Sequence, residues 1–198
     1  MKLKLLSIII FILCISLFLS LGFWQLDRAE EKDNIISLYQ SRQQTDIEKL
    51  PNIKNKNIKE LYYRNYRLKG RYINNVFLID NKIKNKTPGF NVISPFKLKI
   101  SGEVILVDRG WIPMKGTRQD IAKNFNYLNN LEITKNVQEI DGYIYPREKS
   151  YTIGEIFTDK SWPRLIQAVN FKKIAESLGL ESVIINGVIF RLGKNNSF

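Results

Sequence analysis

A stretch of twenty uncharged residues near the N-terminus constrains this chain more than any other feature. Between Leu5 and Trp24 there is no Lys, Arg, Asp or Glu, and fourteen of the twenty residues are Leu, Ile or Phe. At a rise of about 1.5 Å per residue, a helix of this length spans roughly 30 Å, the thickness of a bilayer hydrocarbon core. Residues 1–24 are therefore predicted to form a transmembrane anchor. A cleaved secretory signal is the alternative, but its apolar core is usually shorter, and Ser20-Leu21-Gly22 matches a cleavage site poorly.

The charges on either side of this segment predict its orientation. Lys2, Lys4 and the amino terminus precede it, whereas Arg28 and Lys32 on the far side are interspersed with acidic residues. Positive residues near the ends of a span favour the cytoplasmic side, and a long following domain crosses the membrane largely regardless of charge. The short leading segment leaves no room for an Arg- and Ser-rich transit peptide. We expect a single-pass protein of the bacterial inner (cell) membrane, with a cytoplasmic N-terminus and a periplasmic main domain.

The residue types that are missing limit the chemistry. The single cysteine, Cys14, lies inside the predicted span, and the chain has no histidine. The exported part can therefore form neither a disulfide nor a thiolate site. It also lacks the commonest metal ligand, the usual axial ligand of haem and the default general base. We predict that the protein is not an enzyme and that it holds no metal.

Positive charge is concentrated in one region of the sequence. The net charge is +12, and the segment from Lys49 to Lys86 contains eleven Lys or Arg residues but only Glu60 and Asp80 as acids. Such a surface attracts anionic lipid, acidic proteins or the propionates of a haem. Basic residues interleaved with tyrosines also suit nucleic acid, but the expected location outside the cytoplasm argues against that partner. A solvated face in a Lys- and Asn-rich chain is an equal alternative.

After the anchor, the pattern predicts a stalk and then one domain. Residues 25 to about 39 continue as a polar helix, and residues 40–59 read as a polar connector broken by Pro51. We expect three parts: the anchor 1–24, a juxtamembrane helix and basic connector 25–60, and an exported β-rich domain 61–198. The last part is long enough for one domain with its own core.

Short apolar runs separated by turns predict the architecture of that domain. The expected fold is membrane-anchored α+β, with a mainly antiparallel β-sheet or small barrel and few helices. The run after Val104 is apolar enough to be buried on both faces. One helix is predicted between Asn170 as its N-cap and Gly179 as its stop. The expected strands are 62–72, 76–80, 90–96, 103–108, 137–145 and 183–190.

Turn residues predict how the strands connect. The first two strands are expected to form a hairpin through Asn74-Asn75, because Asn tolerates the left-handed conformation. The segment 85–89 carries the strongest turn signal, with Pro88 and Gly89 as turn residues. Pro95 is expected to end its strand or to keep it at a sheet edge.

A further turn is expected after the buried strand that begins at Val104. Its structural residues are Gly110, which permits a tight change of direction, and Pro113. The strand is therefore predicted to stop near residue 108.

Four segments together resemble those of a known family. The Trp-Gln-x-x-Arg and Val-x-Arg-Gly-Trp-x-Pro elements occur in the order and rough spacing of the surfeit locus protein 1 family, and together they are fairly specific. The matching segments are Gly22–Arg28, Tyr63–Gly70, Pro88–Pro95 and Val104–Pro113, with Gly142, Arg147 and Trp162-Pro163 as weaker landmarks.

The resemblance implies a role in the assembly of cytochrome c oxidase. Members of the family assist maturation of the core subunit, with haem a as the cofactor concerned, and have two transmembrane helices that bracket an exported β-rich domain. Here the strand 183–190 is followed by a short polar end, without a second span and without the family's histidine. The chain is therefore expected to lack the C-terminal transmembrane helix, either as a shortened product or because this copy does not need it.

Two motif residues are candidates for contact with haem. Within the resemblance, Arg109 is expected to bind a propionate and Trp111 to stack on the edge of the ring, as guanidinium and indole geometry allow. Two alternatives stay open: Trp111 fills the core, and Arg109 is a structural counter-ion.

Three residues at the end of the span are candidates for contact with a partner. Trp24, Gln25 and Arg28 lie within about one helical turn and are expected to meet an oxidase subunit or lipid. Trp24 as a simple interfacial anchor and Arg28 paired with Glu31 or Asp27 are the alternatives.

The predicted function is that of a membrane-anchored assembly factor. It is expected to act by contact with the core subunit of cytochrome c oxidase, with haem a as a second target for which no histidine ligand is available. Two alternatives stay open: an exported scaffold or anionic-lipid-interacting domain with no haem role, and a truncated, non-functional copy.

Overall fold

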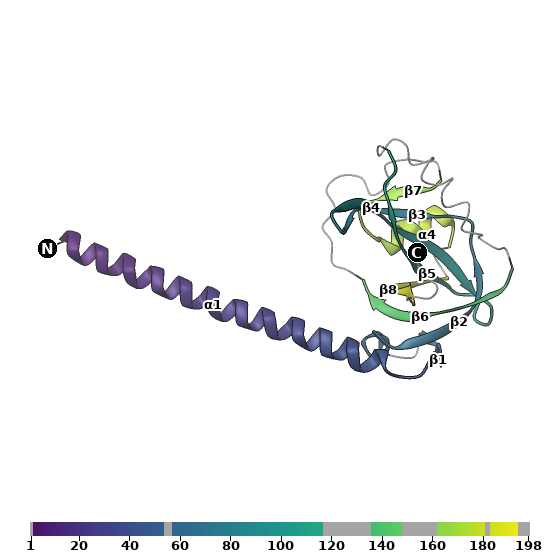
Figure 1. The fold of residues 1–198 in the computed structure, drawn as a ribbon, viewed down its shortest axis with the longest axis horizontal. Helices are drawn as coiled ribbons and strands as arrows, with labels where there is room; N and C mark the ends of the chain where they lie inside the picture. Colours follow the sequence, from purple (N-terminus) through teal and green to yellow (C-terminus); the bar gives the residue numbers. More distant parts are fainter. Residues whose placement is uncertain (1, 54–56, 117–135, 148–161, 181–182, 194–198) are drawn as a thin grey trace. The chain divides into compact units, whose positions relative to one another are not determined.

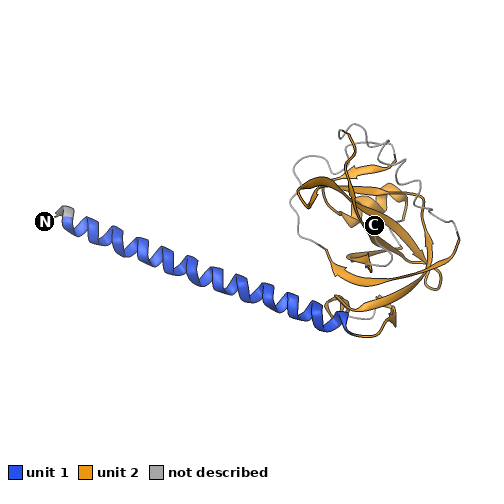
Figure 2. Ribbon diagram, in the orientation of Figure 1, with its two compact units in different colours: residues 1–44 blue, residues 45–198 orange. Residues whose placement is uncertain are grey.

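The chain forms two compact units, residues 1–44 and residues 45–198 (Figure 2). The computed structural model describes residues 2–53, 57–116, 136–147, 162–180 and 183–193. The first unit contains the predicted anchor, and the second contains the predicted β-rich domain.

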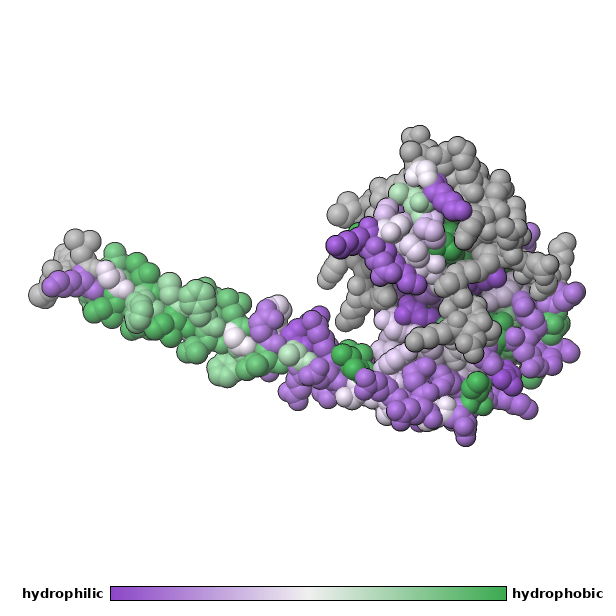
Figure 3. Space-filling view, in the orientation of Figure 1, coloured by the Kyte–Doolittle hydropathy of each residue, from purple (hydrophilic) through white to green (hydrophobic). Residues whose placement is uncertain are grey.

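The first unit is one uninterrupted helix, α1, Lys2–Gln43 (Figure 1). It is long and apolar enough to cross a membrane, with an 18-residue window of mean hydropathy 2.8. In Figure 3 the first part of the helix presents an apolar surface and the remainder a largely polar one. The predicted apolar helix is confirmed, and the polar helix that follows it ends at Gln43 rather than near Tyr39.

This helix is longer than a bilayer requires. Its 42 residues correspond to roughly 63 Å, about twice the thickness of a hydrocarbon core. The expected division at residue 24 is therefore a change in side-chain polarity and not a break in the backbone, because no Pro or turn interrupts α1.

Five strands of the second unit close into a barrel in the order β2-β6-β8-β5-β4, and β2 pairs with β4 to complete the ring (Figure 1). All neighbours in the ring are antiparallel except β5 and β8, which are parallel. A small, mainly antiparallel barrel is one of the two architectures that the sequence predicts for this domain. The five strands are β2 Asn65–Tyr72, β4 Thr87–Leu98, β5 Val104–Pro113, β6 Gln138–Pro146 and β8 Ile184–Leu192.

Further elements are added to this ring. A two-residue strand, β1 (Glu48–Lys49), pairs with β2, and β3 (Phe77–Lys84) lies between β4 and a short strand, β7 (Arg164–Ile166). One turn of helix, α2 (Ile58–Leu61), precedes β2. The helix α4 (Phe171–Leu178) precedes β8.

The predicted caps of α4 are confirmed. The side chain of Asn170 accepts a hydrogen bond from the amide of Lys173, and Gly179 adopts the left-handed conformation at φ 63°. Phe171, Ile174 and Ala175 are buried, so the apolar face of the helix packs on the sheet.

Alternating side chains of β5 enter two different cores. Ile105 and Val107 belong to the cluster inside the barrel, whereas Val104 and Leu106 belong to the cluster that α4 covers. Burial on both faces explains the unbroken apolar run of this strand, as the sequence predicts. The β3–β4 pair also has two buried faces. Ile79 and Ile93 lie in the cluster that α4 covers, whereas Phe90 and Val92 of β4, on the opposite face, belong to a third cluster.

The predicted hairpin through Asn74-Asn75 is wrong. β2 pairs with β1, β4 and β6, and β3 pairs with β4 and β7 instead. After β2 the amide of Ile73 donates to the carbonyl of Pro95, which keeps the chain on β4 and prevents it from folding back on itself. Tertiary pairing with a distant strand therefore overrides the local turn signal.

The tight turn lies at Asn85-Lys86, between β3 and β4. Both residues have positive φ, 51° and 63°, and Lys84 is paired with Thr87, which is the pattern of a two-residue type I′ hairpin. Pro88 and Gly89 are not turn residues: both lie in β4. The prediction of a turn in segment 85–89 is correct, but the chain reverses direction at Asn85-Lys86 and not at Pro88-Gly89.

Pro95 neither ends β4 nor lies at the sheet edge, which contradicts the prediction. β4 continues to Leu98 and is paired with β5 along this stretch. The carbonyl of Pro95 accepts from Ile73, and the nitrogen of a strand residue faces the same side as its carbonyl. On that side β3 has ended and β2 has just begun, since their last and first partners on β4 are Ile93 and Phe96. The N–H group that proline lacks would therefore point between the end of β3 and the start of β2, where neither strand is paired with β4.

The predicted turn after residue 108 is a β-bulge. Asp108 pairs with Ile93 and Trp111 with Asn91, so Arg109 and Gly110 together occupy the space opposite one residue of β4. Gly110 has φ 114°, a backbone conformation that residues with a Cβ atom rarely adopt. β5 continues beyond the bulge to Pro113.

The connector predicted over residues 40–60 belongs largely to the second unit. Ile53 and Leu61 are buried in the barrel core cluster, with Leu50 and Ile58 packed against it. The second compact unit begins at residue 45, and the connector contributes buried side chains to its core.

The two-residue turn provides a test of this hairpin. Lys86→Gly should raise the free energy of unfolding by about 0.5–1 kcal/mol, because glycine removes the strain of positive φ at that position. The control Lys84→Gly, in the neighbouring strand, should lower it by a similar amount. Urea unfolding of the full chain in detergent, followed by tryptophan fluorescence, measures both; a loss of stability in Lys86→Gly would contradict the type I′ turn.

Candidate functional site

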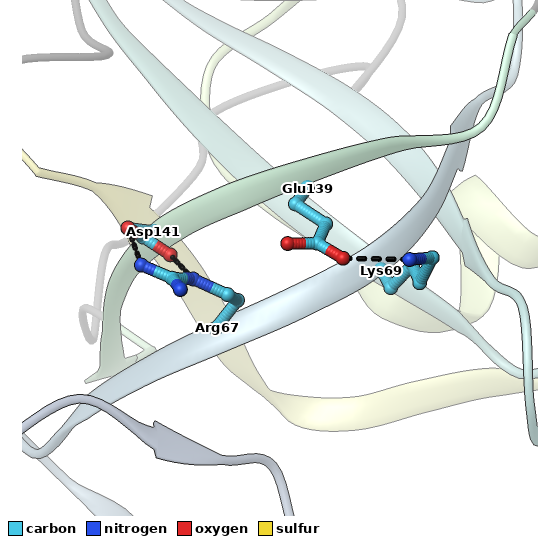
Figure 4. Close-up of polar contacts among 4 residues, drawn as sticks. All are labelled: Arg67, Lys69, Glu139 and Asp141. Atoms are coloured by element: carbon cyan, nitrogen blue, oxygen red, sulfur yellow. Dashed lines mark hydrogen bonds and ion pairs between the residues drawn. The ribbon is translucent and has the colours of Figure 1, made fainter.

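The basic segment predicted from the sequence is partly neutralised by a neighbouring strand. Arg67 forms two hydrogen bonds of 2.7 Å with the carboxylate of Asp141, and Lys69 forms one of 2.7 Å with Glu139. Figure 4 shows the two pairs side by side across β2 and β6. The hydrogen bond from Arg67 lowers the pKa of Asp141, and that from Lys69 lowers the pKa of Glu139. This part of the basic face is a solvated ladder of ion pairs.

The three candidate partner residues lie on α1. Trp24 is 56% exposed, and Arg28 forms an ion pair with Glu31 one turn along the helix. Trp24, Gln25 and Arg28 fall within about 100° of the helix circumference, so they share one face. The local pairing of Arg28 is one of the two alternatives raised by the sequence, and it leaves the face exposed.

Arg109 lies inside the end of the barrel. It is only 8% exposed, and its guanidinium carbon is 4.6 Å from the ring centroid of Tyr72. Burial lowers the pKa of Arg109, and the neighbouring Tyr72 opposes that change. Burial also raises the pKa of Tyr72 to about 12, so the phenol remains protonated and stacks against a cation. Arg109 therefore packs within the fold and does not present its charge at the surface.

Trp111 holds the β3–β4 hairpin against β5. Its indole nitrogen donates to the carbonyl of Lys82 at 3.2 Å, and its ring lies over Gly89, where a Cβ atom would be 2.5 Å away. The ammonium of Lys84 is 5.7 Å from the ring centroid. Arg109 and Trp111 thus engage different neighbours on the two sides of the bulge, and the fold does not bring them together on one ligand.

A pocket beside the barrel brings together residues that no sequence motif associates. Asp108, on the opposite face of β5 from Arg109, is 3% exposed and accepts from the amide of Gly110 at 3.0 Å, from Asn91 at 3.3 Å and from Arg191 at 3.0 Å. The pocket encloses about 50 Å³. Its lining residues are Ile79, Lys82, Asn91, Ile93, Asp108, Tyr145, Arg147, Gln167, Ala168, Val169, Ile189 and Arg191.

Several of these residues lie in segments that the sequence singled out, but the sequence did not associate them with a pocket. Asp108 lies within the Val-x-Arg-Gly-Trp-x-Pro element, and Arg147 was a weak landmark of the resemblance. Nothing in the sequence associates Arg191 with Asp108. The two residues are brought together by the parallel pairing of β8 with β5, which joins residues 80 to 83 positions apart in the chain.

The described residues do not fit a ligated haem. The chain has no histidine, Arg109 is buried, and the pocket of about 50 Å³ is far smaller than the roughly 300–1,000 Å³ of typical cofactor sites. In the part of the chain that the structure describes, no three Cys, Asp or Glu residues are grouped so as to hold a metal ion.

Comparison with known proteins decides the family. The model of the SURF1 family matches residues 12–195, which is almost the whole chain. The chain belongs to the SURF1 family. Members of this family are known as cytochrome c oxidase assembly factors, which agrees with the resemblance found in the sequence.

Curated relatives of this SURF1 family chain include three rickettsial proteins named SURF1-like protein. That of Rickettsia conorii is 29% identical over 188 residues, which is 92% of this chain and 70% of the relative. That of Rickettsia prowazekii is 32% identical over 136 residues, 66% of this chain and 49% of the relative. That of Rickettsia felis is 29% identical over 72% of this chain and 58% of the relative. The matched regions thus span from about half to 70% of these relatives.

The buried ion pair of this SURF1 family protein should matter more for stability than the exposed ladder. Asp108→Asn should lower the free energy of unfolding by about 2–3 kcal/mol, because it removes the carboxylate that Arg191 contacts within the fold. Asp141→Asn, the matched change on the exposed ladder, should cost clearly less, because solvent screens that pair. Urea unfolding of the full chain compares the two; equal losses would contradict the distinction.

Proposed function

We propose that this SURF1 family protein is a membrane-anchored assembly factor that acts by contact with the core subunit of cytochrome c oxidase. The observation that carries the proposal is the family match over residues 12–195. Among the described residues, one apolar helix followed by a compact barrel is consistent with such a role.

The proposed mode of action is binding rather than turnover. In support, the chain contains no histidine and its only cysteine lies in the apolar part of α1. General acid–base or nucleophilic chemistry would therefore have to use less common groups. A protein that binds and releases an assembly intermediate needs complementary surfaces and no reactive side chain.

The proposed contact surface for the oxidase subunit is the face of α1 that carries Trp24, Gln25 and Arg28. The oxidase core subunit is itself embedded in the membrane, so a partner face at the end of a span is well placed for it. An indole and a guanidinium are also the side chains that most often dominate binding energy at interfaces. Because α1 continues as a helix to Gln43, these side chains are held on a rigid element.

Haem a is not assigned to the described residues. They provide no imidazole, the pocket beside the barrel is too small, and the two motif residues expected to hold haem a contact different neighbours. The proposal therefore rests on contact with the protein subunit.

Co-purification tests the proposed partner. Tagged full-length protein, solubilised in mild detergent from cells that make the oxidase, should retain the core subunit. The double substitution Trp24→Ala with Arg28→Gln should reduce that retention about tenfold or more, as expected for loss of interface anchors. Glu30→Gln, on the opposite face of the same helix, is the matched control and should leave retention unchanged.

Two results together would overturn the assembly role. One is the absence of the core subunit from the purified wild-type protein. The other is a normal content of assembled oxidase and haem a in a deletion strain. Equal retention by the double variant and the control would reject only the assigned face.

The proposed location is the bacterial inner membrane, with the barrel outside the cytoplasm. The support is the asymmetry of charge around α1, where Lys2 and Lys4 precede the apolar segment. Protease added to intact spheroplasts should remove the barrel, and a tag at the N-terminus should survive until the cells are lysed. Protection of the barrel in intact spheroplasts would reverse the orientation.

A further inference from the structure

The pocket beside the barrel has a cationic wall that the proposed function does not use. Three basic side chains line it from three separate parts of the chain: Lys82 from β3, Arg147 immediately after β6, and Arg191 from β8. Asp108 is the acidic residue of the lining. With three cations and one carboxylate, the lining carries a formal surplus of two positive charges.

Arg191 is held in place by groups on both sides. Its Nε atom donates to Asp108 at 3.0 Å, and its guanidinium carbon is 4.0 Å from the ring centroid of Tyr145. Burial acts to lower the pKa of Arg191, but the charge of Asp108, assisted by Tyr143 and Tyr145, raises it above the ordinary value. The pocket therefore contains a permanently charged, pre-oriented guanidinium.

The carboxylate of Asp108 already accepts three hydrogen bonds within the fold. One carboxylate oxygen accepts from the amide of Gly110, and the other accepts from Asn91 and Arg191. These bonds explain why a carboxylate that is 3% exposed is tolerated. Its one negative charge lies opposite the three positive charges of Arg191, Lys82 and Arg147 in the lining.

The remaining lining is apolar. Ile79, Ile93, Val169 and Ile189 are all buried and contribute to the wall of the pocket. Apolar walls suit a carbon stem better than a fully hydrated inorganic anion. The cavity volume of about 50 Å³ admits only a small group, since a single water already needs about 10–15 Å³ of such volume.

We propose that this pocket binds a carboxylate group on a short aliphatic stem. Arg191 and Arg147 offer the guanidinium donors that carboxylates prefer, Lys82 adds a positive charge, and the isoleucines and valine contact the stem. Two sources share this chemistry: a small free carboxylic acid, and an acidic side chain or chain terminus of a polypeptide. The site is independent of the oxidase role, because it requires neither α1 nor a membrane partner.

Titration with butyrate tests the site directly. The full-length protein in detergent, with 15N-labelled arginine, is titrated at constant ionic strength, and the Nε–H signal of Arg191 is identified by its loss in Arg191→Lys. We expect a saturable shift of that signal with butyrate and none with butyramide, its neutral analogue. Phosphate should bind more weakly than butyrate. No saturable shift, an equal response to butyramide, or tighter binding of phosphate would each overturn the proposal.

Charge-matched variants separate a site from general attraction. Lys82→Gln with Arg147→Gln should weaken butyrate binding by about tenfold, as expected for the loss of two partly exposed charge contacts. The control, Lys86→Gln with Arg71→Gln, removes the same charge from residues outside the lining and should change binding little. Equal weakening by the two pairs would show long-range attraction only and would overturn the proposal.

A comparison with peptides distinguishes a small free acid from a carboxylate of a polypeptide. A short peptide with a free terminal carboxylate is compared with its amidated form and with butyrate. Binding of the free peptide more tightly than butyrate, with loss on amidation, identifies a polypeptide carboxylate, whereas butyrate binding alone identifies a small acid. Because the assay contains no oxidase, its failure would leave the proposed assembly role unaffected.

Discussion

The closure of the sheet by the β2–β4 pairing is the constraint on which the rest of the second unit depends. Gly70, Arg71 and Tyr72 pair with Leu98, Lys97 and Phe96, and only through these contacts does an open sheet become a barrel. Gly70 permits the approach, because a Cβ atom there would lie 2.1 Å from the carbonyl oxygen of Lys97. The long strand β4 serves both the barrel and the β3 extension, and Pro95 lies where it changes partner.

Closure of the barrel also determines which ion pairs lie on its outer surface and which lie within the fold. On the outer face of the barrel, basic residues of β2 meet acidic residues of β6 and form an exposed ladder, in which each pair contributes little to stability. On the face covered by α4 and β7, Asp108 and Arg191 pair at low exposure and orient one wall of a pocket. The exposed pairs and the Asp108–Arg191 pair therefore have different consequences, because the surrounding dielectric differs.

The candidate residues illustrate how far motif reasoning extends. The element around Arg109 and Trp111 was correctly singled out, and it lies at a bulge that sends the two side chains to different neighbours. An insertion of one residue in a strand changes which face each side chain takes, and neither composition nor spacing reveals it. Arg191 was not found, because its relation to Asp108 arises from a parallel pairing between strands distant in the chain.

The sequence by itself determined the apolar helix, a mainly antiparallel sheet or small barrel, the doubly buried strand β5 and both caps of α4. These features depend on local periodicity, length and the conformational preferences of single residues such as Asn170 and Gly179. Only the tertiary structure decided the partner of β2, the position of the tight turn at Asn85-Lys86, the burial of Arg109 and the pocket around Arg191. Each of these depends on which distant strands pair, and pairing is a property of the closed sheet as a whole.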